Sequence, residues 1–291
     1  IVSLYITHCQ EAQILYFFDF CTIITLFIIG IYMQEFIANL DIYMLLLLFF
    51  AAFVAGFVDS IAGGGGMITI PALLLAGISP LQALATNKLQ SSFGSFSATL
   101  QFYKKGYINI KSKIPFAATA FCFAAIGTTA VQFLQADFLS KILPFLILIF
   151  GLYFLFSPSI KEAKQTKKFN PVYLSLTIAA VGFYDGFFGP GTGSFFMLAL
   201  IVIGGFGITQ SLGEAKLYNF STNLASLIFF AIGGHMLWGV GLLMALGQFI
   251  GANLGSKMAI RYGIYIIKPL VVVVSFLMAA KLLYDQLYGI L

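Results

Sequence analysis

One glycine-rich motif occurs twice in the chain, and this repetition constrains the fold more than any other feature. The first copy reads Gly-Phe-Val-Asp-Ser-Ile-Ala and then four glycines (residues 56–66). The second reads Gly-Phe-Tyr-Asp-Gly-Phe-Phe-Gly-Pro-Gly-Thr-Gly (residues 182–193). In each copy an aspartate precedes the glycines, and a lone lysine follows in an uncharged run; these are Asp59 and Lys88, then Asp185 and Lys216. The pattern predicts two homologous halves.

The composition places these halves in a membrane. The chain is 60% hydrophobic and only 9% charged, whereas soluble domains are about 25% charged. Apolar runs of about 20 residues recur along it, the length that a spanning helix needs. The net charge of +5 comes from lysines clustered in short loops, as the positive-inside rule describes. We therefore expect an all-α, polytopic membrane protein that contacts the lipid bilayer and no nucleic acid.

The repeat sets the expected organisation. The first half covers 43–158, a cytoplasmic linker 159–170 and the second half 171–291. Each half is predicted to contain five helical segments. The segment after each glycine cluster is too short to span the bilayer, which makes a broken, glycine-rich helix.

Five segments per half is an odd number, so the halves should have opposite orientations in the membrane. The loop at 104–113 has four lysines and its counterpart at 233–237 has none, whereas the basic residues of the last hairpin lie at 257–263. The basic residues thus lie at different places in the two halves, as an inverted repeat requires under the positive-inside rule. The alternative is that the short pieces are half-crossings, which leave four spans per half in parallel orientation.

Residues 1–42 form an N-terminal extension without a counterpart in the second half. An additional transmembrane helix over 12–32 is one interpretation. Another is translated upstream sequence before a start at Met33 or Met44. Whether residues 1–32 belong to the mature protein stays open.

The glycine clusters are candidate anion sites. A helix that starts after glycines offers free backbone N–H groups and the positive end of its dipole. Plain close packing of helices is the alternative. The candidate residues are Gly63, Gly64, Gly65, Gly66, Gly191, Thr192 and Gly193.

Polar side chains on the following helices are further candidates. A charged Lys88 or Lys216 inside a membrane is energetically unfavourable unless it faces a partner or a water-filled path. For Lys88, snorkelling of the side chain to the membrane interface is an alternative. Amides lie within a turn of them and could donate to oxyanions or bond neighbouring helices; they are Asn87, Gln90 and Asn219, with Ser91 and Asn223 nearby.

The acidic residues leave three roles open. Asp59 and Asp185 could pair with the lysines, cap the broken helices or carry a proton coupled to transport. Glu214 has no acidic counterpart, because Thr86 occupies the matching position.

No catalytic pattern is present, neither a nucleophile with its base nor a Walker loop. The three cysteines and two histidines lack metal-ligand spacing. We therefore expect no enzymatic activity, no cofactor and no metal site.

The motifs resemble those of the TauE/SafE sulfite exporters, a family also called toluene sulfonate uptake permeases. The resemblance spans about 43–286; its motifs lie at 56–66, 69–72, 85–88, 182–190, 215–217 and 281–285. It implies secondary transport of sulfite, sulfonates or related sulfur anions, and in this branch a bacterial inner-membrane location.

The resulting prediction is a secondary transporter that exports small sulfur-containing anions by alternating access between the glycine breaks and the two lysines. An anion channel and a non-transporting membrane scaffold are the alternatives. The sequence identifies neither the transported anion nor the coupling ion, and it is compatible with a homo-oligomer.

Overall fold

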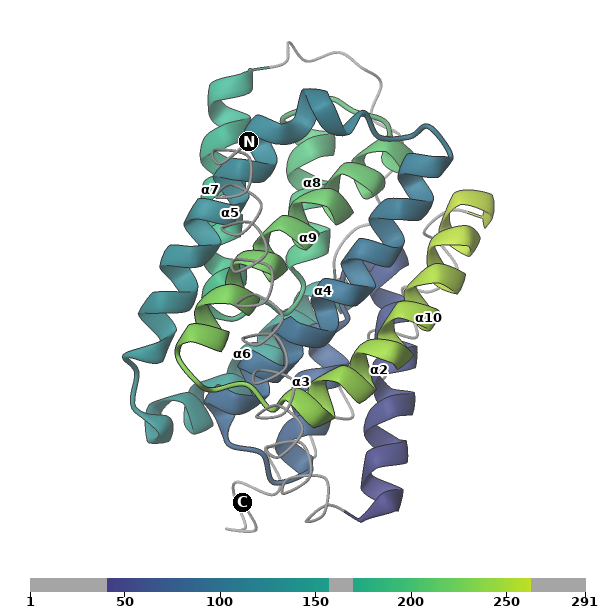
Figure 1. Cartoon of the computed structure of the whole chain (residues 1–291). Coiled ribbons are helices and arrows are strands. Elements are labelled where there is room, and N and C mark those ends of the chain that lie inside the picture. Colours follow the sequence, from purple (N-terminus) through teal and green to yellow (C-terminus); the bar gives the residue numbers. More distant parts are fainter. Residues whose placement is uncertain (1–40, 157–169, 263–291) are drawn as a thin grey trace, which may run out of the picture.

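The structure, a computed structural model, describes residues 41–156 and 170–262, and every regular element in these ranges is an α-helix (Figure 1). The N-terminal extension, most of the linker and the predicted last helix lie outside the described residues. The helices are α2 (Ile42–Ala62), α3 (Gly66–Leu75), α4 (Pro80–Lys104), α5 (Ile110–Gln132), α6 (Ala136–Phe156), α7 (Pro171–Phe187), α8 (Thr192–Val202), α9 (Ile208–Ile232) and α10 (Trp238–Tyr262).

Three of these helices are long and apolar enough to cross a membrane, namely α2, α5 and α10. Helices α4 and α9 have 25 residues each, but they carry the buried lysines and amides, which lower their hydropathy. The all-helical, apolar architecture of the described residues agrees with the predicted polytopic membrane protein.

Glycine geometry breaks the helices where the sequence predicts. Helix α2 ends at Gly63, whose φ of 78° is left-handed, a conformation that costs a residue with a Cβ. The chain turns into α8 through Gly189 and Gly191, at φ 94° and 81°. The helices that follow these breaks, α3 and α8, have only 10 and 11 residues.

The tightest helix pairs join one half to the other. Helix α10 packs on α2 through a ridge of glycines, and a Cβ on Gly251 would lie 2.0 Å from the carbonyl oxygen of Phe53. Helix α5 packs on α7 in the same manner, and a Cβ on Gly186 would lie 2.0 Å from the carbonyl oxygen of Ala124. At this spacing the backbones are in direct contact, as small residues allow between membrane helices.

The two pairs also match position by position. A Cβ on Gly56 of α2 would meet the carbonyl of Gln248, and one on Gly182 of α7 would meet that of Ala120. Figure 1 shows the pairs running in opposite directions: α10 rises to its yellow end at the upper right, and α5 descends to its junction with α6 at the lower left.

Helix α5 begins earlier than the sequence predicts. Its first residue is Ile110, so Lys111 and Lys113 lie in its first turn and not in the predicted loop at 104–113. Lysine is a good helix former, and the turn is already complete at Gly106, which has a φ of 76°. The chain can therefore become helical directly after Asn109.

Candidate functional site

The two glycine breaks touch each other. A Cβ on Gly63 would lie 2.3 Å from the backbone nitrogen of Ser194, and one on Gly193 would lie 2.7 Å from the Cα of Gly63. The Ser194 hydroxyl donates to the carbonyl of Ala62 at the end of α2. The repeated motifs, distant in sequence, are therefore in backbone contact at the junction of the halves.

Two ion pairs cross the same junction. Lys88 on α4 lies 2.7 Å from Asp185 on α7, and Lys216 on α9 lies 2.9 Å from Asp59 on α2. Each lysine thus pairs with the aspartate of the other motif copy. The four side chains are at most 11% exposed, so removing one partner would leave a charge buried, which typically costs about 3–5 kcal/mol.

A small polar cavity lies between these groups. The space open to the centre of a water molecule is ≈ 10 Å³, room for about one water. Its wall is almost entirely polar, and it is lined by Asp59, Gly63, Gly66, Asn87, Lys88, Ser91, Asp185, Gly189, Gly193, Asn219 and Asn223. Both halves contribute to this list, so the cavity belongs to the junction and to neither half alone.

The Asp185 carboxylate is surrounded by donors. One oxygen accepts from Lys88 at 2.7 Å and from the Thr192 hydroxyl at 2.9 Å. The other oxygen accepts from the hydroxyl of Thr222 on α9. Donors from three helices therefore surround this carboxylate. Each threonine hydroxyl shares its single hydrogen with a backbone carbonyl, that of Gly189 for Thr192 and that of Asn219 for Thr222.

The Asp59 carboxylate has a different environment. One oxygen accepts from Lys216 at 2.9 Å and the other from the backbone N–H of Gly65 at 3.2 Å. Lys216 also donates to the Asp59 backbone carbonyl. The side chain of Asp59 therefore occupies part of the glycine cradle that the sequence suggested for a free anion.

The amides form a local network on α4 and α9. Asn87 accepts from Thr69 at 2.6 Å and from Gln90 at 3.2 Å. Asn223 donates to Asn219 at 2.9 Å. In the part of the chain that the structure describes, the buried Oε1 of Gln90 has no hydrogen-bond partner.

The structure brings most of the predicted residues to one place, but only some line the cavity. Those in its wall are Asp59, Gly63, Gly66, Asn87, Lys88, Asp185, Gly193 and Asn219. The predicted residues that do not line it are Gly64, Gly65, Gln90, Gly191, Thr192 and Lys216. Lys216 is fully buried, with Asp59 as its partner, so of the two lysines only Lys88 faces the space.

Sequence reasoning missed Thr222, whose hydroxyl bonds Asp185. Its one signal is position, because it follows Asn219 by three residues and so shares its face of α9. A threonine in a membrane helix usually bonds its own backbone, and Thr222 does so at the Asn219 carbonyl. Its longer-range role therefore needs the structure.

Glu214, the carboxylate without an acidic counterpart in the first half, lies in a cluster separate from the cavity. It is buried and lies 2.9 Å from Lys113 of α5, and it accepts from Gln210 at 2.8 Å. The Lys113 ammonium also lies 4.2 Å from the ring centroid of Phe206, within cation–π range. This cluster joins the start of α5 to α9 and does not reach the cavity.

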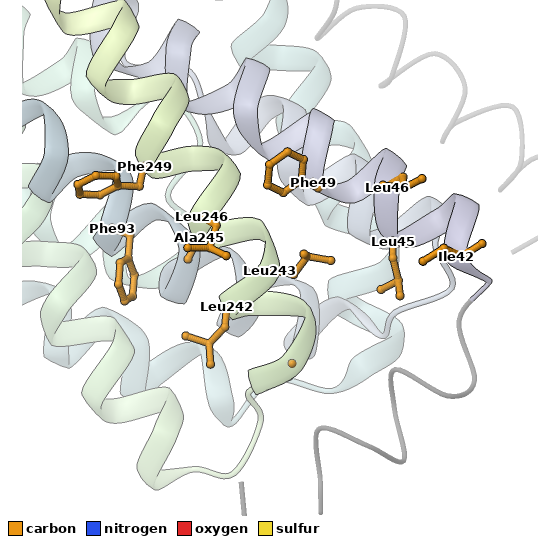
Figure 2. A pocket seen from close by; sticks show the side chains of 11 residues that line it. Ile42, Leu45, Leu46, Phe49, Phe93, Leu242, Leu243, Ala245, Leu246 and Phe249 are labelled. Atoms are coloured by element: carbon orange, nitrogen blue, oxygen red, sulfur yellow. The ribbon is translucent and has the colours of Figure 1, made fainter. Parts of the chain in front are cut away.

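A larger groove between α2, α4 and α10 has a different character. It has a volume of ≈ 880 Å³ and almost entirely apolar walls. Figure 2 shows Phe49, Phe93 and Leu246 among the side chains around it. Such a surface offers an anion no donor and suits hydrocarbon.

The chemistry that the junction allows is binding, with no sign of bond-breaking. Among residues 41–156 and 170–262, no group of three His, Cys, Asp or Glu side chains could hold a metal ion. The cavity offers one ammonium, glycine backbone and three amides, which are donors for an oxyanion. Its space holds about one water, so any larger ligand requires the lining residues to move apart.

Comparison with known proteins identifies the family of the chain. The family described as "Sulfite exporter TauE/SafE" matches residues 48–282. A probable membrane transporter protein, ORF9, of Sinorhizobium sp is 48% identical over 248 residues, which cover 85% of this chain and 95% of the relative. A probable membrane transporter protein of Haemophilus influenzae is 45% identical over 249 residues, covering 85% and 98%. YfcA of Escherichia coli, named likewise, is 45% identical over 240 residues, covering 82% and 89%.

No solved structure matches the chain. The family match covers both glycine motifs and both lysines, and the relatives are named transporters and not enzymes. The resemblance inferred from the motifs is thus confirmed: the chain belongs to the TauE/SafE sulfite exporter family and is a membrane transporter.

Proposed function

We propose that the protein is a secondary transporter of small sulfur-containing anions, such as sulfite or short sulfonates, and that the anion binds in the cavity between the glycine breaks. The observation that carries this is the small polar cavity, lined by both halves, inside an apolar helical protein. Polar groups are costly in that environment and usually mark a substrate path. The family description, sulfite exporter, supports the class of substrate.

Alternating access at this site is supported by the packing. The matched glycine contacts and the opposite directions of α2–α10 and α5–α7 are what an inverted repeat produces. In such folds the substrate lies between the repeats and each side opens in turn. The present cavity has room for about one water, so this arrangement would be a state without bound anion. We place the protein in a bacterial inner membrane that the chain crosses several times.

The packing also suggests which parts move. Helices α2 and α10 come from different halves, yet their backbones touch, and the same holds for α5 and α7. Surfaces packed this tightly do not slide apart easily. We therefore propose that the moving bodies are these mixed pairs, and not the sequence halves themselves.

Export is the favoured direction for an anion that carries net negative charge across. An inside-negative potential of about 100 mV favours its exit by about 2.3 kcal/mol per charge. A proton carried along would offset this force.

The test is thermal unfolding of the purified full-length protein with sulfite, sulfate, thiosulfate, short sulfonates, phosphate and carboxylates. A ligand at 100 times its Kd should stabilise the protein by about 2.7 kcal/mol. The stabilisation should be lost in Lys88→Gln and retained in Lys105→Gln, which changes an exposed lysine at the end of α4. Stabilisation by no sulfur anion, or equal stabilisation of both variants, would contradict the proposal.

Liposome flux separates a carrier from an anion channel. A carrier should saturate and support counterflow, in which unlabelled anion on one side drives labelled anion uphill. A channel would give flux without counterflow.

A further inference from the structure

Charge balance at the junction points to a coupled proton. The buried cluster contains two lysines and two aspartates in ion pairs, so its formal charge is zero. A monovalent anion that enters this cavity adds one uncompensated negative charge among buried groups inside an apolar protein, which is strongly unfavourable. This argument rests on the proposed function, because it starts from an anion in this cavity.

We propose that Asp59 takes up a proton when the anion binds, and that Asp185 remains ionised. Protonation of one carboxylate returns the cluster to zero charge. It also frees the Lys216 ammonium from its partner and removes a negative group from the cavity wall. The assignment to Asp59 follows from how differently the two carboxylates are held.

Asp185 has the stronger set of donors. Besides Lys88, the hydroxyls of Thr192 and Thr222 lie within hydrogen-bond distance of it, and its side chain is 2% exposed. Each hydroxyl shares its hydrogen with a backbone carbonyl, yet both add donor capacity next to Asp185 that favours a charged carboxylate.

Asp59 lacks both hydroxyls, and the repeat shows why. Thr192 is the first residue of α8, and the first residue of α3 is Gly66. Thr222 follows its lysine by six residues, and the residue in that place after Lys88 is Gly94. In the described structure the carboxylate of Asp59 keeps only Lys216 and one backbone N–H as donors.

Asp59 is also the more accessible of the two carboxylates. It lines the cavity, and its side chain is 11% exposed. It therefore lies where an incoming anion would meet it, in front of the fully buried Lys216.

Among the described residues, the titratable groups that line the cavity with Asp59 are Lys88 of α4 and Asp185 of α7, and its ion-pair partner is Lys216 of α9. Helix α10, which packs on α2, carries Lys257 and Arg261, and both are exposed. From α3 the contact is a backbone N–H. Of the two carboxylates in this set, Asp59 is held less firmly, and it is where the proton enters.

The stoichiometry has a measurable consequence for transport. A monovalent sulfonate that moves with one proton carries no net charge, so the membrane potential does not act on it. A divalent anion with one proton carries one negative charge, so the inside-negative potential still drives it outward.

The experiment measures ethanesulfonate binding to the full-length protein in detergent between pH 5.5 and 8.5, by calorimetry in two buffers of different ionisation enthalpy. Ethanesulfonate stays ionised across this range, so the pH dependence belongs to the protein. Wild type should take up one proton per anion, and its affinity should fall by about tenfold per pH unit above the midpoint.

Two variants test the charge balance and the position of the proton. Asp59→Asn should bind without proton uptake and with a Kd that is constant across the pH range, because the unpaired Lys216 then balances the anion. Thr222→Val removes a hydroxyl from beside Asp185 and leaves all four charges in place, so it should keep the proton uptake and the midpoint of wild type. Affinity that still depends on pH in Asp59→Asn, or a midpoint that moves to higher pH in Thr222→Val, would overturn the assignment.

A third variant keeps both ion pairs and so avoids the risk of misfolding. Gly66→Ser adds a hydroxyl where α8 has Thr192. The space is adequate, because a Cβ there would lie 3.4 Å from the nearest atom, the Cα of Pro190. An added donor to Asp59 should move the midpoint of the affinity curve to lower pH, and an unchanged or higher midpoint counts against the proposal.

The outcomes distinguish this inference from the proposed function. Wild-type protein that binds no sulfonate or sulfite at any pH would refute the function itself. Wild-type protein that binds with no proton uptake would leave the function standing and refute the coupling.

Discussion

The glycine ridge of α10 gives the most direct test of the packing, through Gly251→Ala. The added Cβ would lie 2.0 Å from the carbonyl oxygen of Phe53, well inside van der Waals contact. The atom in the way belongs to a backbone, so α10 and α2 must move apart. Overpacking of this kind costs about 1–3 kcal/mol, and about 1 kcal/mol shifts the Tm of a domain of 150–250 residues by about 2–4 °C.

The expected result for Gly251→Ala is therefore a Tm lowered by roughly 2–12 °C. Gly186→Ala on α7 should behave alike, because its Cβ would lie 2.0 Å from the Ala124 carbonyl oxygen. Gly207→Ala is the matched control: its φ is −63° and a Cβ there meets nothing within 4 Å.

The assay is thermal unfolding in one detergent, followed by intrinsic fluorescence and by the loss of the monodisperse peak in size exclusion. Gly251→Ala and Gly186→Ala should melt below wild type. Gly207→Ala should melt within about 2 °C of it, since the loss of a good N-cap residue is offset by the lower conformational freedom of the unfolded chain. If Gly251→Ala melted at the wild-type temperature, the direct backbone contact between α2 and α10 would be wrong.

Three further predictions concern the charges and the break. Lys88→Gln should destabilise the protein by up to about 3–5 kcal/mol, because Asp185 loses its cation. The double variant Lys88→Gln/Asp185→Asn should regain the wild-type Tm but not transport. If the single variant were as stable as the double variant, the ion pair would be refuted. Lys113→Met should lower the Tm more than Glu214→Gln does, because only the first leaves a buried charge unpaired; the reverse order in thermal unfolding would contradict this. Gly63→Ala should abolish anion flux in liposomes, since its φ is 78° and a Cβ would lie 2.3 Å from the Ser194 nitrogen; normal flux would show that the breaks do not touch.

Much of the fold could be predicted because it depends on local properties of the sequence. Apolar runs mark helices, and glycine clusters mark their ends, since only glycine readily adopts the left-handed conformation found at Gly63 and Gly191. The repeat placed the two breaks in equivalent positions. The sequence predicts too late a start for α5, because its lysines favour a loop, although lysine is compatible with a first helical turn.

The candidate site could be predicted only as a set of residues. The sequence brings Asp59, Asp185 and the two lysines to attention, but it cannot say that each lysine lies against the aspartate of the other copy, because this depends on how the halves pack. Nor does it indicate that Asp59 fills part of the glycine cradle, or that Thr222 supports Asp185. These are contacts between distant segments, and neither composition nor periodicity encodes them directly.

The exchange of partners between the halves has a consequence for synthesis of the protein. Asp59 and Lys216 are 157 residues apart in the chain. At about 5–20 residues per second, the ribosome needs roughly 8–30 s to reach the lysine after it has passed the aspartate. During that time α2 has no α10 to pack against, and its carboxylate has no cation. The first half must therefore wait in the membrane with polar groups unsatisfied, which makes the nascent chain a substrate for insertases and quality-control proteases until the second half arrives.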